Sequence, residues 1–396
     1  MRIGLLHPFS LGYTTIYDCL QSGDDYALFI DRGKREAFEK EKPANVTLVM
    51  VENYQENIEM VCGNWLEKEH LDALLALDEF DVEVAARLRE NYGIPGQSAA
   101  LTKVFRNKNV MTERVRELGF RVPNSTRVQS FQEAEEFLRT HGKIIVKPLA
   151  GAGSVDTFPL EASEGVGRLE DLDFPSLLLQ EYIEGDIYHI EGLLASGQVI
   201  YCEPSRYLYN PLLIKEGISA AAVSLEQNHR DYAPLRDYAI HLARSLDSKD
   251  TYLFHLEVFY TGEEIIFLEI ACRMGGARIR QNLERKFGQD PFALLLTAVG
   301  KHNLPELPEH FPAVGWLLTA KKSGVLQRIP DLTPEKLEEF GIYDTILYTK
   351  IGRKIQSAQH SADAVQGLSF VGKDFETVRR QLLAAEAWCL QETHYF

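Results

Sequence analysis

The alternation of short apolar runs with helical patterns in the first hundred residues constrains the fold more than any other feature of the sequence. The runs occupy residues 3–6, 26–30, 46–51 and 71–77, which is the length of buried strands. Apolar positions at helical spacing follow in residues 81–92, and Gly93 is a typical helix stop. Strands that alternate with helices favour a small open α/β sheet, so we expect a first domain that ends near residue 100.

Composition and charge exclude several classes of protein. With 396 residues, of which 45% are apolar and 25% charged, the chain can bury cores in two or three domains. The 58 acidic and 42 basic side chains give a formal charge of −16, which repels a phosphate backbone. We therefore expect no nucleic-acid partner, and an anionic substrate must be received by a few placed cations and metal ions.

Cysteine spacing and the first apolar run indicate the compartment. The five cysteines are scattered and never spaced as CxxC, so neither a disulfide framework nor a zinc site is indicated. A reducing, cytoplasmic location fits this pattern. The apolar run that begins the sequence is too short to span a bilayer, and we expect no membrane association.

A β-hairpin is predicted where two alternating apolar strands flank the turn at residues 261–263. We predict the register that pairs Tyr260 with Glu264, which places the carboxylates of Glu257 and Glu269 on one face. A slip of one residue would separate them. Carboxylates on a rigid sheet suit Mg²⁺, whereas a solvated surface hairpin is the simpler explanation for an isolated pair of strand glutamates.

Residues beyond the second glutamate add to this cluster. Arg273 could stabilise negative charge on a transferring phosphoryl group. Gly275 and Gly276 would let a substrate carboxylate approach backbone N–H groups closely.

Two lysines are candidate phosphate ligands. Lys147 ends an apolar strand just before a turn that contains Gly151 and Gly153, and Lys108 begins a helix. Taken singly, a lysine at a helix start is usually solvated, and a lone GxG turn is weak evidence. The sequence contains no GxxxxGK[ST] motif, so the turn is not a Walker A loop.

The ordered set of segments resembles the ATP-grasp superfamily, in the branch of carboxylate-amine or carboxylate-thiol ligases that includes L-amino acid ligases and carnosine-synthase-like enzymes. The segments that carry the resemblance are residues 77–80, 93–96, 106–108, 119–123, 146–148, 151–154, 180–185, 255–257 and 268–276. The resemblance implies an α/β (α+β) chain with the ATP-grasp fold. It would have an open α/β pre-ATP-grasp domain (1–102), an ATP-grasp domain (103–310, lid at about 126–182) and a small α+β subdomain (311–396).

The resemblance also implies roles for individual residues. ATP phosphates would be bound by Lys108, Lys147, Gly151, Gly153 and Ser154. The adenine edge would be read by Gln180, Glu181, Tyr182 and Ile183, and the ribose by Asp186, which replaces a common glutamate. Glu257 and Glu269 would bind Mg²⁺, Arg273 and His255 would be catalytic, and Gly275, Gly276 and Arg278 would contact substrate, although Arg278 could equally be a surface arginine. Ala271 stands where many relatives carry an asparagine ligand, which leaves the number of metal ions open.

The activity implied by the resemblance is ligation. ATP and Mg²⁺ would activate a carboxylate, expected to be an amino acid, as an acyl phosphate that is coupled to an amine. One alternative is transfer of an amino acid such as glutamate to the thiol of an acyl carrier protein in antibiotic biosynthesis. Another is a non-catalytic ATP-binding protein, which Ala271 makes conceivable. Biotin-dependent carboxylation is less favoured because no Met-Lys-Met biotin motif occurs. The sequence leaves a homodimer open.

Overall fold

The first hundred residues fold as an open parallel sheet. The computed structural model describes residues 1–151, 153–164, 167, 173–360 and 362–396. Its N-terminal sheet has the order β3-β2-β1-β4, with strands β1 (Arg2–His7), β2 (Asp25–Asp31), β3 (Val46–Val51) and β4 (Ala73–Ala76). The accompanying helices are α1 (Leu11–Thr14), α2 (Ile16–Cys19), α3 (Arg35–Lys40), α4 (Tyr54–Leu66) and α5 (Val82–Tyr92). The predicted stop is confirmed, since Gly93 caps α5 with a φ of 66°.

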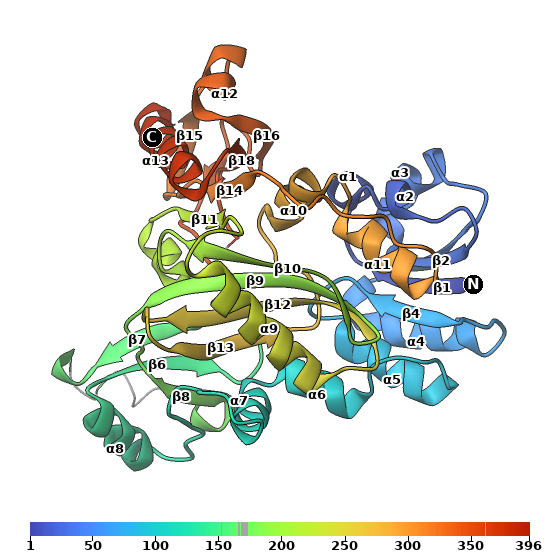
Figure 1. Cartoon of the computed structure of the whole chain (residues 1–396), viewed down its shortest axis with the longest axis horizontal. Helices are drawn as coiled ribbons and strands as arrows, with labels where there is room; N and C mark the ends of the chain where they lie inside the picture. Colours follow the sequence, from blue (N-terminus) through green and yellow to red (C-terminus); the bar gives the residue numbers. More distant parts are fainter. Residues whose placement is uncertain (152, 165–166, 168–172, 361) are drawn as a thin grey trace.

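A second, antiparallel sheet follows two short helices (Figure 1). The helices are α6 (Ala99–Arg106) and α7 (Lys108–Glu117), and the side chain of Asn107 caps α7. The sheet has the order β5-β8-β6-β7, with β5 (Ser125–Thr126), β6 (Lys143–Pro148), β7 (Phe158–Glu161) and β8 (Leu177–Glu181). Helix α8 (Phe131–His141) packs an apolar face against this sheet and closes a separate small core.

The largest sheet has the order β13-β12-β9-β10-β11-β14-β18-β16 and is antiparallel throughout. Its strands are β9 (Asp186–Ala195), β10 (Gln198–Tyr207), β11 (Ala220–Ser224), β12 (Thr251–Tyr260), β13 (Ile265–Ala271), β14 (Ala313–Leu318), β16 (Ile342–Leu347) and β18 (Gln366–Gly372). The remaining strands are β15 (Gly324–Arg328), β17 (Lys354–Ile355) and β19 (His394–Tyr395).

Helices cover the two faces of this sheet differently. Helices α9 (Tyr232–Leu246) and α13 (Phe375–Glu392) close an apolar core on one face. On the other face, α10 (Ile279–Phe287) and α11 (Pro291–Val299) share a core with the N-terminal sheet, and α11 contacts both α2 and β12. The short helix α12 (Pro334–Phe340) packs on α13. The N-terminal unit is thereby fixed beside the strands that carry the candidate site.

The register of the β12–β13 hairpin differs from the prediction, although its consequence for the glutamates holds. The predicted pairing of Tyr260 with Glu264 is wrong, because the turn includes Glu264 and Tyr260 pairs with Ile265. A β-bulge after Glu257 adds a second residue of offset, so that Glu257 lies directly opposite Glu269. One residue of slip alone would have placed the carboxylates on opposite faces.

The domain boundaries near residues 102 and 310 stay predictions. Strand β14 pairs with β11, so the large sheet continues across residue 310 into the C-terminal segment. The predicted lid at about 126–182 includes positions outside the described residues. Within the described part of the chain, no helix is both long and apolar enough to cross a membrane, and all five cysteines are free thiols.

Candidate active site

A cleft lies between the β5-β8-β6-β7 sheet and the β9–β12–β13 edge of the large sheet. It contains about 810 Å³ of space unfilled by atoms, part of which is open to solvent. The predicted site residues that line it are Lys108, Lys147, Gly151, Gly153, Ser154, Gln180, Glu181, Tyr182, Ile183, Glu257 and Glu269. Residues from five separate segments of the sequence therefore line one cleft.

Lys147 is a buried ammonium group that faces this cleft. The residue is 4% exposed, and its ammonium group forms no hydrogen bond or ion pair with any described residue. Burial, aided by the charge of Lys108, lowers the pKa of Lys147 to about 8, although the carboxylates of Glu269 and Glu257 act in the opposite direction. A desolvated cation without a partner is unfavourable by itself and is therefore suited to an anionic ligand.

Lys108 lies at the first turn of α7 and faces the same cleft. Its Nζ is 2.8 Å from Oε1 of Glu269 and 3.4 Å from the carbonyl oxygen of Gly151. One predicted phosphate ligand is thus ion-paired with one predicted metal ligand. A divalent cation bound at Glu269 would compete for that oxygen and leave Lys108 available to another anion.

Glu257 is held as a carboxylate. Its Oε1 accepts a hydrogen bond of 2.8 Å from the Tyr207 hydroxyl and lies 3.5 Å from Nε2 of His255. Burial would raise the pKa of Glu257, but the interactions with His255 and Tyr207 lower it below its ordinary value. With Glu269 directly opposite, the pair offers the hard oxygen atoms that Mg²⁺ prefers. Ala271 is buried opposite His255 and adds no side-chain ligand.

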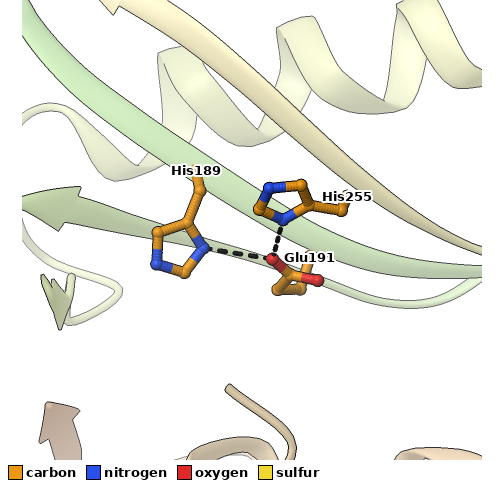
Figure 2. A group of neighbouring side chains, drawn as sticks. All are labelled: His189, Glu191 and His255. Carbon is orange, nitrogen blue, oxygen red and sulfur yellow. Dashed lines mark hydrogen bonds and ion pairs between the residues drawn. The ribbon is translucent and has the colours of Figure 1, made fainter. Parts of the chain in front are cut away.

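Next to this pair, the side chains of His189, Glu191 and His255 form a buried cluster (Figure 2). Nδ1 of His255 and Nδ1 of His189 both contact Oε1 of Glu191, the latter at 3.1 Å. Oε2 of Glu191 accepts a hydrogen bond of 3.0 Å from the backbone N–H of Gly275. Burial would lower the pKa of His255, but the charge of Glu191 raises it to about 10.

Arg273 lies outside the cleft described above. Its guanidinium Nε donates to Glu79, and its Nη1 donates to the carbonyl oxygen of Met274 at 2.8 Å. Glu79 also pairs with Arg106, so one buried carboxylate holds two arginines. Arg273 lines a second cavity, between the N-terminal sheet and β12. Its charge still interacts with the carboxylate of Glu269, which lines the first cleft.

Two further predicted site residues also have other partners. The carboxylate of Asp186 is at the protein surface and pairs with Arg206 at 2.7 Å, while the next residue, Ile187, lines the cleft. Arg278 is buried, where it pairs with Asp344 and donates to the Ser369 hydroxyl at 3.2 Å. It is therefore not a surface arginine, and in the structure its guanidinium is engaged within the protein. Of the two predicted substrate-binding glycines, Gly275 is buried and Gly276 is exposed.

The glycine-bearing turn shows why glycine is needed. Gly151 and Gly153 have φ values of 156° and 65°, which side chains rarely adopt, and both line the cleft. Ser154 shares this strained region with a φ of 57°. Ala152, which belongs to the predicted loop, lies outside the described residues.

Sequence reasoning missed four residues of the site region. Tyr207, Glu79, His189 and Glu191 received no role. Tyr207, Glu79 and Glu191 each bind a predicted site residue, and His189 binds Glu191. A signal existed for two of them. His189 and Glu191 are polar residues at alternate positions of an otherwise apolar strand, and such a pattern marks a polar face that must be satisfied inside the protein.

Part of the chain matches a known protein family. Residues 105–277 match the family model described as ATP-grasp domain. A curated relative, the L-arginine-specific L-amino acid ligase of Bacillus subtilis, is 28% identical over 229 residues, which are 54% of this chain and 54% of that protein. The chain thus spans about half the length of that relative.

Solved structures share the fold over the whole chain. The L-amino acid ligase from Bacillus licheniformis has a TM-score of 0.76 at 15% identity and covers 100% of this chain and 98% of its own. The biotin carboxylase domain of 2-oxoglutarate carboxylase from Hydrogenobacter thermophilus, solved with MgADP, has a TM-score of 0.69 at 14% identity over 100% and 90% of the two chains. Residues 105–277 therefore match an ATP-grasp domain, and the whole chain shares its fold with these solved ligase and carboxylase structures.

Proposed function

We propose that this protein is an ATP- and Mg²⁺-dependent ligase that activates an amino acid carboxylate as an acyl phosphate and couples it to an amine. The observation that carries the proposal is the cleft that combines the ammonium of Lys147, which has no partner in the described part of the chain, with the opposed carboxylates of Glu257 and Glu269. A cation and a pair of carboxylates in one cleft suit a polyphosphate that binds together with a divalent metal ion.

The cleft fits both ATP and Mg²⁺. Lys147 and Lys108 would bind phosphate oxygens, and Gly151 and Gly153 would allow the backbone to approach them. The cleft is also lined by apolar side chains that suit a purine ring, namely those of Ile145, Ile183, Ile187, Phe259 and Leu268. Mg²⁺ held by Glu257 and Glu269 would offset the negative charge of the phosphates.

The chain's other residues would act on the acyl group. Gly276 lies exposed in the loop after the second carboxylate, and its backbone N–H would receive the substrate carboxylate, while the N–H of Gly275 is donated to Glu191. Arg273 would offset negative charge on the acyl phosphate through its guanidinium, which Glu79 and the carbonyl oxygen of Met274 hold. Glu79 would keep that guanidinium oriented.

The acyl substrate and acceptor are inferred from relatives. Both the curated relative and the structural neighbour from Bacillus licheniformis are named L-amino acid ligases, which supports an amino acid as the activated carboxylate and an amine as the acceptor. Among the described residues, no contact favours a carrier-protein thiol as the acceptor. The assay below therefore includes carrier proteins to test this acceptor.

The proposal is tested by a screen for ADP release. The purified protein is incubated with ATP, Mg²⁺ and each amino acid, with and without amines or carrier proteins, and products are identified by mass. Added hydroxylamine should trap the acyl phosphate as a hydroxamate. Release of AMP instead of ADP would contradict the acyl phosphate, and ATP binding without turnover in any combination would favour a non-catalytic protein.

A matched pair of variants tests the site. Lys147→Met should abolish carboxylate-dependent ADP release. Lys143→Met changes a lysine of the same strand that pairs with Glu161 outside the cleft, and it should retain activity. Equal activity of the two variants would refute the assignment of the cleft.

A further inference from the structure

We infer that Glu191 is a positioning residue that fixes the double-glycine loop, residues 273–277, to the metal-facing His255. The inference deepens the proposed function and rests on it, because it assigns to Glu191 the alignment of the acyl substrate with the metal carboxylates. Glu191 is not among the site residues that were expected from the sequence.

Glu191 has three partners inside the protein. It is 2% exposed near the middle of β9, where the ladder places it opposite His255 of β12. One carboxylate oxygen contacts Nδ1 of both His189 and His255, and the other accepts the N–H of Gly275. A carboxylate can only accept, so both imidazoles donate from Nδ1 (Figure 2). Glu191 is therefore the common acceptor of two strands and one loop.

These contacts join two halves of the proposed reaction site. Nε2 of His255 lies 3.5 Å from Oε1 of Glu257, and Glu257 lies opposite Glu269. A continuous series of contacts therefore runs from the carboxylate pair through His255 and Glu191 to the backbone of Gly275. Because His255 and Glu191 belong to adjacent central strands, this series is rigid at its centre and ends in a loop without secondary structure of its own.

The loop approaches His255 and Glu191 closely at Gly275. A Cβ atom at position 275 would lie 2.6 Å from Nδ1 of His255 and 2.8 Å from Oε1 of Glu191, distances that real Cβ atoms do not show. A Cβ atom at position 276 would meet nothing within 4 Å. The first glycine thus serves the close approach to Glu191, and the second leaves the exposed side of the loop open for a ligand.

The geometry of the cluster is that of hydrogen bonds. Both imidazole Nδ1 atoms meet the same carboxylate oxygen at hydrogen-bonding separation, and the other oxygen is taken by Gly275. A transition metal would instead separate the ligands and bind each of them at roughly 2.0–2.2 Å. We assign the cluster a positioning role on the basis of these hydrogen bonds, and a bound transition metal is one of the outcomes that the test below measures.

Hydrogen exchange of the loop tests the inference without any need for turnover. In Glu191→Gln the charge that attracts both imidazoles is lost, and the amides of residues 272–278 should exchange about ten-fold faster or more than in the wild type. Asp24→Asn is the matched control, since Asp24 is also a buried carboxylate bonded to a histidine, His302 at 2.7 Å, but touches no part of the loop. It should leave loop exchange unchanged.

Kinetics then test the consequence for the reaction. We expect Glu191→Gln to raise KM for the carboxylate substrate and to lower kcat, each about ten-fold, while KM for ATP changes less than about two-fold. Gly275→Ala should produce the same changes in KM and kcat, because its Cβ would displace the loop from His255 and Glu191. This variant replaces Glu191→Gln in the test if Glu191→Gln does not fold.

Three results would overturn the inference. They are unchanged loop exchange in Glu191→Gln, an equal rise in KM for ATP and for the carboxylate, and a stoichiometric transition metal in the purified wild type that this variant lacks. If the wild type releases no ADP with any carboxylate, the proposed function fails, whereas the exchange experiment still decides whether Glu191 holds the loop.

Discussion

Replacement of Lys147 by methionine should make the protein more stable and inactive at once. The ammonium group is buried without a partner among the described residues, and methionine has a similar length without the charge. The variant removes an unfavourable charge from the unliganded protein and also the cation proposed to bind phosphate. Stability and function should therefore move in opposite directions, which is unusual for a buried residue.

The magnitude follows from the pKa. Burial lowers the pKa of Lys147 from 10.5 to about 8, which corresponds to about 3 kcal/mol against the charged form. Because the unfolded chain binds this proton more tightly, the wild type becomes more stable as pH rises from 8 to 10.5. Lys147→Met should thus be about 3 kcal/mol more stable than the wild type at pH 7, and by pH 9.5 about half of this advantage should remain.

Urea unfolding of both proteins at pH 7 and pH 9.5 measures this difference. Lys143→Met controls for general effects of charge, because the side chain of Lys143 is partly exposed and pairs with Glu161. Excess Mg²⁺ and ATP should stabilise the wild type and Lys143→Met but not Lys147→Met. A Lys147→Met protein less stable than the wild type at pH 7 would show that the ammonium has a favourable partner, and would refute the reasoning.

Three further perturbations test other parts of the site. Glu269→Gln should reduce ADP release by more than the roughly 10–100-fold that is typical of residues behind a metal ligand. Glu264→Gln, in the exposed turn of the same hairpin, should leave ADP release unchanged. Steady-state kinetics over a range of Mg²⁺ concentrations measure both effects. Tyr207→Phe removes a hydrogen bond that lowers the pKa of Glu257, so the acid limb of the kcat/KM profile should move up by about one pH unit, and an unmoved limb would exclude Glu257 as the group observed. Glu79→Gln leaves two buried arginines without their carboxylate and should cost about 3–5 kcal/mol in urea unfolding; a loss below about 1 kcal/mol would mean that solvent already screens the pair.

The nucleotide side of the site could be predicted because its signals are local. Lys147 ends an apolar strand and precedes two glycines, so its position at the end of a sheet could be inferred from neighbouring residues alone. The hairpin glutamates are twelve residues apart, and alternation along two short strands indicated a shared face. Even there the pairing itself was wrong, because the turn is one residue longer than predicted and a β-bulge after Glu257, which has no clear sequence signal, adds a second residue of offset.

The partners of the arginines could not be predicted, since they depend on contacts between distant segments. Arg273 pairs with Glu79, which lies 194 residues earlier on the N-terminal unit. Arg278 pairs with Asp344 on β16, although its position after two glycines suggested a substrate contact or an exposed surface. A charged residue needs some partner when buried, but which partner it finds is decided by how the units pack.

The sequence by itself determined the elements and the chemistry that they carry: strands that end in lysine or glycine, a hairpin with two glutamates, and the order typical of an ATP-grasp domain. These follow from periodicity and turn residues, which act over a few residues. Only the tertiary structure decided which of these groups are free and which are bound. It leaves the Lys147 ammonium without a partner among the residues that the structure describes, pairs Arg273 with Glu79, and brings Glu191 to Gly275 across 84 residues. The reason is physical, because burial and pairing of charges depend on distances that no local pattern fixes.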